Sequence, residues 1–153
     1  MKLIAHRGNI DGPNPERENS PEYIEEALKA GYDVEVDVWY DCAAETFWLG
    51  HDEPQYEATR YWMSSKKDKL WVHCKSLASL EYFNSKTGGF NYFWHQNDDY
   101  TLTSRRQIWA YPGKPYTKDT VIVMPEWKKD VDWDMLRVTN CLGVCSDYVG
   151  KLK

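Results

Sequence analysis

Short apolar runs recur along the whole chain, and most of them end in a polar or charged residue. Seven of these runs have the length and composition of β-strands: 2–6, 33–39, 70–75, 91–95, 107–111, 120–124 and 143–147. Helical patterns separate some of the runs, and strands that alternate with helices pair in parallel through crossover connections. The sequence therefore predicts an α/β protein built on a parallel sheet.

Local signals place two helices and one hairpin between these runs. Ser20 is a suitable N-cap and Pro21 suits the first helical position, so a helix is expected to begin there. Ser76 is expected to open a second helix, and residues 46–49 read as a short strand that extends the second strand as a hairpin. Two later segments carry turn residues and no clear helical period: 97–106 and 111–119.

The second run carries two carboxylates that point the same way. Residues two apart in a strand share a face, so Glu35 and Asp37 lie together, opposite Val34, Val36 and Val38. Two such acids could be surface residues on an edge strand, but the three valines indicate that the strand is buried. Because adjacent buried carboxylates repel each other and a hard divalent cation needs closely placed oxygens, this pair predicts a metal site.

Four motifs stand in order in the first half of the chain: His6-Arg7-Gly8, Glu18-Asn19, Glu35-Val36-Asp37 and Gly50-His51-Asp52. In these motifs the chain resembles the glycerophosphodiester phosphodiesterase family, within the wider phosphatidylinositol-phospholipase-C-like superfamily. Lys75 matches the lysine of that family's third strand, and 145–148 is similar to its closing strand end. The resemblance covers the chain to about Lys75, together with that tail.

The resemblance implies a TIM-like (β/α) barrel. A full barrel usually needs roughly 200–250 residues, whereas this chain has 153 and offers seven strand candidates. We therefore expect a compact, pruned TIM-like barrel that forms one domain over residues 1–153. Parallel barrels keep their sites at the C-terminal ends of the strands, where most of the motif residues fall.

The family resemblance assigns general acid–base catalysis to His6 and His51. An isolated histidine is more often structural, but imidazole titrates in the useful range and both residues stand in family motifs. We take His6 as the base and His51 as the acid, although the reverse assignment is open. By the same resemblance, Glu35 and Asp37 bind Mg²⁺ or Ca²⁺.

His73 departs from the family pattern, which has an acid two residues before the lysine. As a metal ligand, His73 would offer nitrogen in place of oxygen and shift the preference toward Mn²⁺ or Zn²⁺. Alternatively, His73 only hydrogen-bonds the substrate, while Glu35 and Asp37 hold the ion with waters.

Other polar and aromatic residues at the expected mouth complete the candidate site. The expected phosphate-binding residues are Arg7, Lys75 and His95, and the expected supporting residues are Glu18, Asn19, Trp109 and Glu126. Glu18 would be a further ligand or hold His6 or Arg7, unless it is a surface acid before the helix. Asn19 would fix the loop. The aromatic residues of the second half either line the mouth or fill the core.

Composition narrows the choice of partners. The 24 acidic and 19 basic residues give a net charge of −5, which argues against nonspecific nucleic-acid binding. No apolar stretch approaches the roughly 18 residues of a transmembrane helix, so we expect no stable membrane insertion. Met1 leads almost at once into the first strand, so we expect no signal peptide and a cytoplasmic protein. Nothing in the pattern sets the oligomeric state.

These observations predict a metal-dependent phosphodiesterase that hydrolyses or cyclises a small phosphodiester. A second hypothesis is a binding protein for phosphorylated metabolites that keeps the barrel mouth but has lost full metal binding, which His73 favours. A third is a lyase-type reaction on a phospholipid, as in the sphingomyelinase-D-like branch. The chain lacks the apolar loop or basic run that would dock it on a membrane, which makes the third hypothesis weaker.

Overall fold

A computed structural model describes residues 1–85 and 88–153 of the chain. Its strands are β1 (Lys2–His6), β2 (Asp33–Asp41), β3 (Thr46–Leu49), β4 (Tyr56–Ala58), β5 (Leu70–Cys74), β6 (Asn91–Phe93), β7 (Tyr100–Leu102), β8 (Ile108–Ala110), β9 (Thr120–Val123) and β10 (Gly143–Ser146). Its α-helices are α1 (Pro21–Lys29), α2 (Arg60–Lys66), α3 (Leu77–Ser85) and α4 (Trp133–Arg137), and its 3₁₀ helices are η1 (Pro125–Trp127) and η2 (Val149–Leu152).

The strands form one mostly parallel sheet, which confirms the predicted α/β class. Parallel pairs run in the order β6-β5-β2-β1-β10-β9-β8. The antiparallel strand β7 extends β8, and the β3–β4 hairpin pairs with the second half of β2. All of the strands expected from the sequence are present, whereas β4, β7, α2 and α4 carried no recognised signal.

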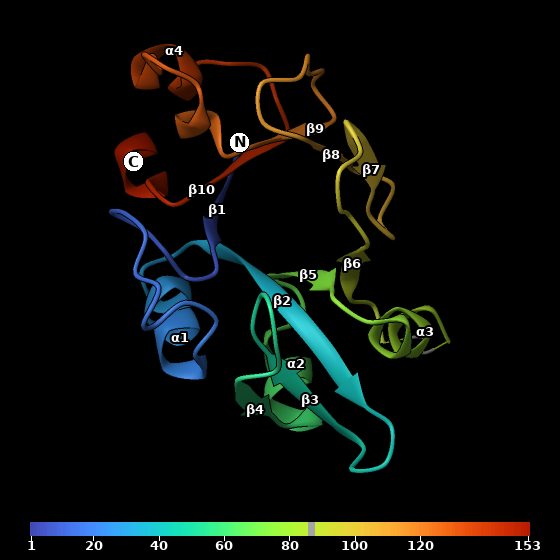
Figure 1. Ribbon diagram of the computed structural model, residues 1–153. Coiled ribbons are helices and arrows are strands. Elements are labelled where there is room, and N and C mark those ends of the chain that lie inside the picture. Colours follow the sequence, from blue (N-terminus) through green and yellow to red (C-terminus); the bar gives the residue numbers. More distant parts are fainter. Residues whose placement is uncertain (86–87) are drawn as a thin grey trace.

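The sheet curves into an arc but is open, so the closed barrel that the resemblance implies is not observed. Figure 1 shows the strands around this arc, with helices α1 to α3 on its outer side. In the described residues no strand ladder joins β6 to β7, so the sheet is open between these two strands. One backbone hydrogen bond does link the turn after β7 to β6, from Ser104 N to Tyr92 O (2.8 Å).

Helix α1 forms as its boundary residues predict. The Ser20 hydroxyl accepts a hydrogen bond from Tyr23 N, and Pro21 stands in the first turn, where its missing N–H costs nothing. Ile24 and Ala27 on one face of the helix are fully buried among the core residues that cover the sheet. Gly31 follows the helix with φ +91°, a conformation that favours glycine.

The strands separate two groups of buried side chains. Val34, Val36 and Val38 belong to the larger cluster, which lies between the sheet and its helices. A smaller cluster on the other face contains Ile4, Trp71, Phe93, Trp109, Val121 and Cys145. Because strand side chains alternate, the residues two positions after Ile4, Trp71 and Cys145 share this inner face. Those residues are His6, His73 and Asp147.

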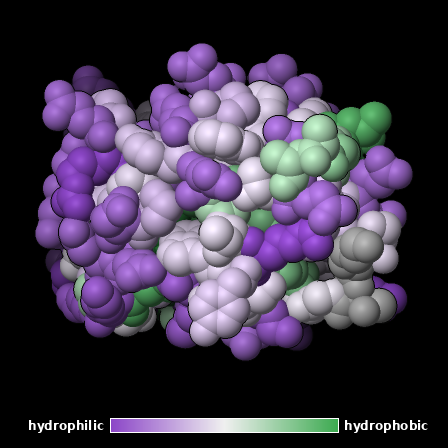
Figure 2. All heavy atoms as spheres, turned by 90° about the horizontal axis from the view of Figure 1, so that it is seen from below, coloured by the Kyte–Doolittle hydropathy of each residue, from purple (hydrophilic) through white to green (hydrophobic). Residues whose placement is uncertain are grey.

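None of the described helices is long and apolar enough to cross a membrane. Figure 2 shows one face of the molecule, on which hydrophilic residues predominate and hydrophobic atoms gather in only a few places.

Candidate metal centre and the cavity beside it

A cavity of about 140 Å³ lies at the C-terminal ends of the parallel strands. Its polar lining is His6, Arg7, Glu35, His73, His95 and Gln96. Its apolar and aromatic lining is Trp109, Tyr111, Pro112, Val123, Met124 and Trp127. Residues from β1, β2 and β5 thus face residues from the second half of the chain, as expected for the mouth of a parallel sheet.

Three side chains beside this cavity could together hold a metal ion. Glu35, Asp37 and His73 each present one ligand atom, and the three atoms lie within 4.8 Å of one another. Both carboxylates are buried, and His73 Nδ1 lies 3.1 Å from Asp37 Oδ1 and 3.6 Å from Glu35 Oε1. Neighbouring strands cause this grouping, because the β2–β5 register sets Asp37 beside His73.

Two carboxylate oxygens of this group suggest that a cation would fit. Among the described residues, Glu35 Oε2 and Asp37 Oδ1 have no partner with hydrogen-bond geometry although both atoms are buried. A buried anionic oxygen without a donor is costly, and a divalent ion would remove that cost. The donor set of two carboxylates and one imidazole suits such an ion.

Three basic groups surround Asp37. Arg7 Nε lies 2.9 Å from its Oδ2, and Lys75 Nζ lies 3.7 Å from its Oδ1. Burial alone would raise the pKa of Asp37, but the close approach of His73 Nδ1 and the nearby positive charges lower it well below its usual range. Burial would likewise lower the pKa of His73, but Asp37 and Glu35 raise it to about 9. Without a metal, an imidazolium therefore partly neutralises the acid pair, and a metal bound there would replace its proton.

Asn19 holds Asp37 through a pair of hydrogen bonds. Its Nδ2 donates to Asp37 Oδ2 and its Oδ1 accepts from Asp37 N, each at 3.0 Å. Asn19 has φ +64°, a left-handed conformation that asparagine tolerates better than most residues. The residue expected to fix the loop thus also orients a carboxylate of the metal group.

Glu18 contacts Arg7, which is one of the roles expected for it. Its Oε2 accepts from Arg7 Nη1 (3.2 Å) and its Oε1 accepts from Asn9 Nδ2 (2.9 Å).

Gly8, which follows Arg7 in the chain, occupies a position where a larger residue would clash. A Cβ on Gly8 would lie 2.8 Å from the ring of Tyr23, and the φ of Gly8 is +94°. Helix α1 therefore packs so closely on this turn that only glycine fits beside Arg7.

His6 is held from the other end of the chain. Its Nδ1 lies 2.7 Å from Asp147 Oδ1, and its Nε2 lies 3.9 Å from Glu35 Oε2. Burial would lower the pKa of His6, but the hydrogen bond to Asp147 and the charge of Glu35 raise it overall. With Nδ1 committed to Asp147, the second ring nitrogen is left for chemistry beside the metal group.

Asp147 is a residue whose role the sequence reasoning missed. Its place at a strand end was visible, but its pairing with His6 spans 141 residues and leaves no local signal. Glu126 was expected as a supporting residue, and it accepts hydrogen bonds from Asp147 N (2.8 Å) and from Ser146 Oγ (2.9 Å). Glu126 thus holds the backbone that carries Asp147.

The structure does not bring His51 into the cavity. Its side chain is 42% exposed, its Nδ1 lies 2.7 Å from Asp52 Oδ1, and it is absent from the described cavity lining. The preceding residue is anchored near the metal group, because Gly50 N donates to the backbone oxygen of Asp37 (3.1 Å). The backbone just before His51 is therefore held beside Asp37 by this hydrogen bond, whereas the side chain of His51 faces solvent.

The remaining expected residues differ in position. His95 lines the cavity, and its carbonyl oxygen lies 2.8 Å from His73 Nε2. Trp109 is both cavity lining and core, because it packs on Phe93 with ring centroids 4.6 Å apart. Lys75 faces Asp37 but is not part of the described cavity lining.

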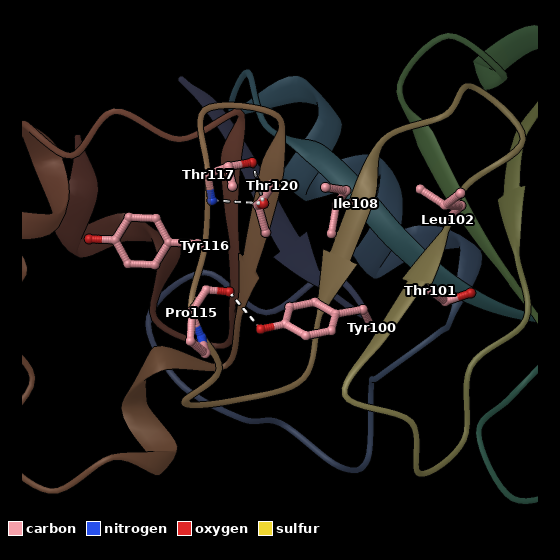
Figure 3. A pocket seen from close by; sticks show the side chains of 8 residues that line it. All are labelled: Tyr100, Thr101, Leu102, Ile108, Pro115, Tyr116, Thr117 and Thr120. Carbon is pink, nitrogen blue, oxygen red and sulfur yellow. Dashed lines mark hydrogen bonds between the residues drawn. The ribbon is translucent and has the colours of Figure 1, made fainter.

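A larger hollow of about 630 Å³ lies elsewhere, along β7 and β8. Figure 3 shows its lining, where the Tyr100 hydroxyl donates to the carbonyl of Pro115 and Thr117 lies against Thr120. None of the expected site residues lines this hollow, and its lining in the described part of the chain includes no carboxylate, histidine or lysine. The chemistry of the described residues is therefore concentrated in the smaller cavity.

No family model matches the sequence, and no curated protein or solved structure matches the chain.

Proposed function

We propose that the protein is a metal-dependent phosphodiesterase that acts on a small glycerophosphodiester-like substrate. One observation carries the proposal: His6, held by Asp147, lies 3.9 Å from Glu35, which belongs to the group that could hold a divalent ion. A proton acceptor and a cation-binding group thus border one cavity together with Arg7. Phosphodiester cleavage needs these components close together.

Each residue has a distinct task in this proposal. Glu35, Asp37 and His73 would hold Mg²⁺, Ca²⁺ or a transition metal, which when bound neutralises the phosphate charge. His6 Nε2 takes the proton of the attacking hydroxyl, which is that of water in hydrolysis or of the substrate in cyclisation. The proton taken up by His6 is stabilised by the Asp147 carboxylate on the opposite nitrogen. Arg7 and His95 contact the phosphate.

His51 is assigned as the general acid by the motif alone. To protonate the departing alkoxide, its loop must carry the ring from solvent toward the cavity. Gly50 beside it has φ +150° and leaves no room for a Cβ, which would lie 2.1 Å from Glu53 O. The loop is thus held at Gly50, while the side chain of His51 is free of the core.

The scaffold in this proposal is a pruned TIM-like barrel. The parallel strands follow chain order around the arc, apart from the added hairpin and β7. The hydrogen bond from Ser104, in the turn after β7, to Tyr92 of β6 supports an arrangement in which the β7–β8 hairpin approaches β6 across the opening of the sheet. The small cavity volume suits a phosphate with a short alcohol, because pockets for larger ligands usually exceed about 300 Å³.

A binding protein for phosphorylated metabolites is the second candidate. The exposed position of His51 favours it, and so do the basic groups of Arg7, His73 and Lys75 around Asp37. Such a protein would bind a phosphate monoester or diester through Arg7 and His6 and release it unchanged. The retained pairing of His6 with Asp147 favours the enzyme, since binding alone does not need an oriented base.

Purified protein incubated with glycerophosphodiesters of different alcohols separates the two candidates. The enzyme is expected to release a phosphomonoester or cyclic phosphate only with a divalent metal, and to lose this activity in the His6→Ala variant. The Arg137→Ala variant, which changes a residue of α4 that is not part of the described cavity lining, should retain it. Saturable binding of the diester with no turnover under any metal would favour the binding protein.

A further inference from the structure

The imidazole ring of His73 is fixed by two contacts from β6 and the residues after it. The Phe93 ring stacks on it with centroids 5.0 Å apart and planes inclined by 11°. The His95 carbonyl oxygen lies 2.8 Å from His73 Nε2. The ring is thus held both in its plane and in its rotation.

These contacts decide which nitrogen faces the carboxylates. A carbonyl oxygen can only accept a hydrogen bond, so Nε2 carries the proton in this contact. In the neutral ring the lone pair then lies on Nδ1, which is 3.1 Å from Asp37 Oδ1 and 3.6 Å from Glu35 Oε1. Metal-binding histidines commonly donate their second N–H to a backbone carbonyl in this way.

We propose that Phe93 and the His95 carbonyl are positioning groups that present His73 as an Nδ1 ligand, so that the centre selects a transition metal such as Zn²⁺ or Mn²⁺ over Mg²⁺. The reason is the donor set, because imidazole nitrogen favours the softer divalent ions and carboxylate oxygen alone does not. The inference rests on the metal centre of the proposed function but not on any turnover.

The competing explanation is that His73 is a permanent bridge. In that case the ring donates to the His95 carbonyl from one nitrogen and to the carboxylates from the other, and no metal enters. The two buried oxygens without a donor, on Glu35 and Asp37, argue against a complete bridge. Of these two oxygens, Asp37 Oδ1 lies 3.1 Å from His73 Nδ1 and Glu35 Oε2 lies 3.9 Å from His6 Nε2.

The first test observes the ring directly. Protein labelled with ¹⁵N in its histidine rings is titrated with Zn²⁺, and the His73 signals are assigned by their loss in His73→Gln. The inference expects Nδ1 to shift to a coordinated position while Nε2 keeps its proton. Coordination through Nε2, or His73 signals that do not respond to Zn²⁺, would overturn it.

The second test addresses the positioning groups by calorimetric titration with Zn²⁺ and Mg²⁺. Phe93→Leu should weaken Zn²⁺ binding about 10-fold to 100-fold, the usual effect of losing an outer contact of a metal ligand, with little change for Mg²⁺. Phe83→Leu is the matched control, because Phe83 is a buried, stacked phenylalanine of the other cluster. His95→Ala keeps the carbonyl and should retain Zn²⁺ affinity.

Phe93→Tyr keeps the stacked ring and should restore the Zn²⁺ affinity that Phe93→Leu loses, which separates positioning from general damage to the fold. Equal Zn²⁺ affinity in wild type, Phe93→Leu and Phe93→Tyr would refute the role of the stack. The inference and the proposed enzymatic activity can fail separately. Zn²⁺ coordinated at His73 Nδ1 without phosphodiester cleavage would contradict only the proposed phosphodiesterase activity. Phosphodiester cleavage supported by Mg²⁺, together with His73 ring signals that do not change on addition of Zn²⁺, would contradict only this inference.

Discussion

His6 Nδ1 and Asp147 Oδ1 lie 2.7 Å apart, so one side-chain contact joins the C-terminal ends of the first and last strands along the chain, which are neighbours in the sheet. Asp147 also accepts a hydrogen bond from Asn9 Nδ2 at 2.8 Å, and its backbone N–H is held by Glu126. The carboxylate is therefore fixed independently of His6. It sets the tautomer of the imidazole and leaves Nε2 directed toward Glu35.

Asp147→Asn should lower kcat by about 10²-fold to 10⁴-fold, because the amide holds the imidazole in the wrong tautomer and no longer stabilises its protonated form. Asp134→Asn is the control, since Asp134 is an exposed partner of Arg137 on α4. Steady-state rates with and without metal provide the measurement. An Asp147→Asn enzyme as active as the control would show that the pair is only structural.

The two histidine variants should differ in how they respond to the leaving group. Removing a proton-transfer group costs about 10²-fold to 10⁴-fold in turnover. p-Nitrophenolate leaves without a proton, whereas a glycerol alkoxide needs one. His51→Ala should therefore damage cleavage of a glycerophosphodiester far more than cleavage of a p-nitrophenyl diester, and His6→Ala should damage both. If both variants lose the same factor on both substrates, the assigned division of roles is incorrect.

The inner face of the sheet could be predicted from the sequence because its pattern is local. Alternation along β2 placed Glu35 and Asp37 opposite the valines. Ser20 and Pro21 likewise marked the start of α1 correctly. Each of these features depends on neighbours within a few residues or on the periodicity of a strand.

The features that could not be predicted depend on distant pairs or on very short elements. The contact between His6 and Asp147 forms only when β1 pairs with β10. The strand β7 is three residues long and takes its conformation from β8, so its own sequence carries little signal. The sheet is open between β6 and β7, which form no ladder with each other in the described residues, and strands of three residues carry little pairing signal.

Asp33, at the opposite end of β2, should make stability depend on acid. It lies 3.0 Å from the amino groups of both Lys2 and Lys69 and accepts a hydrogen bond from Trp71 Nε1. Burial would raise the pKa of Asp33, but these contacts lower it overall. A lowered folded-state pKa adds stability above the unfolded value of about 3.9, and this stability is lost as the pH falls through the folded-state pKa.

Asp33→Asn should therefore cost about 2 kcal/mol of unfolding free energy at neutral pH, as expected for hydrogen bonds to a charged group. The difference from wild type should shrink below about pH 4, where the wild-type carboxylate becomes protonated. Urea unfolding at a series of pH values measures both. Glu26→Gln serves as the control, because its pair with Arg17 is exposed and should contribute little at any pH. A pH-independent difference for Asp33→Asn would mean that packing, not charge, causes the loss.

His73→Glu should turn the metal centre into one that needs a hard cation. The substitution replaces an imidazolium between Glu35 and Asp37 by a third carboxylate, so the metal-free protein gains repulsion that Arg7 and Lys75 only partly offset. We expect a lower thermal midpoint in the presence of a chelator. We also expect tighter Mg²⁺ and Ca²⁺ binding and a weaker preference for Mn²⁺ or Zn²⁺, because hard cations favour oxygen ligands.

Thermal unfolding at increasing Mg²⁺ concentration measures this prediction, since a ligand that binds only the folded state stabilises it by RT ln(1 + [L]/Kd). The midpoint of His73→Glu should rise steeply with Mg²⁺ and pass that of His73→Gln, which is similar in size but uncharged. If His73 instead contacts only the substrate phosphate, Glu at this position repels that phosphate, so KM rises while the order of metal affinities stays as in wild type. An unchanged order of affinities, together with parallel Mg²⁺ responses of the Glu and Gln variants, would rule out residue 73 as a metal ligand.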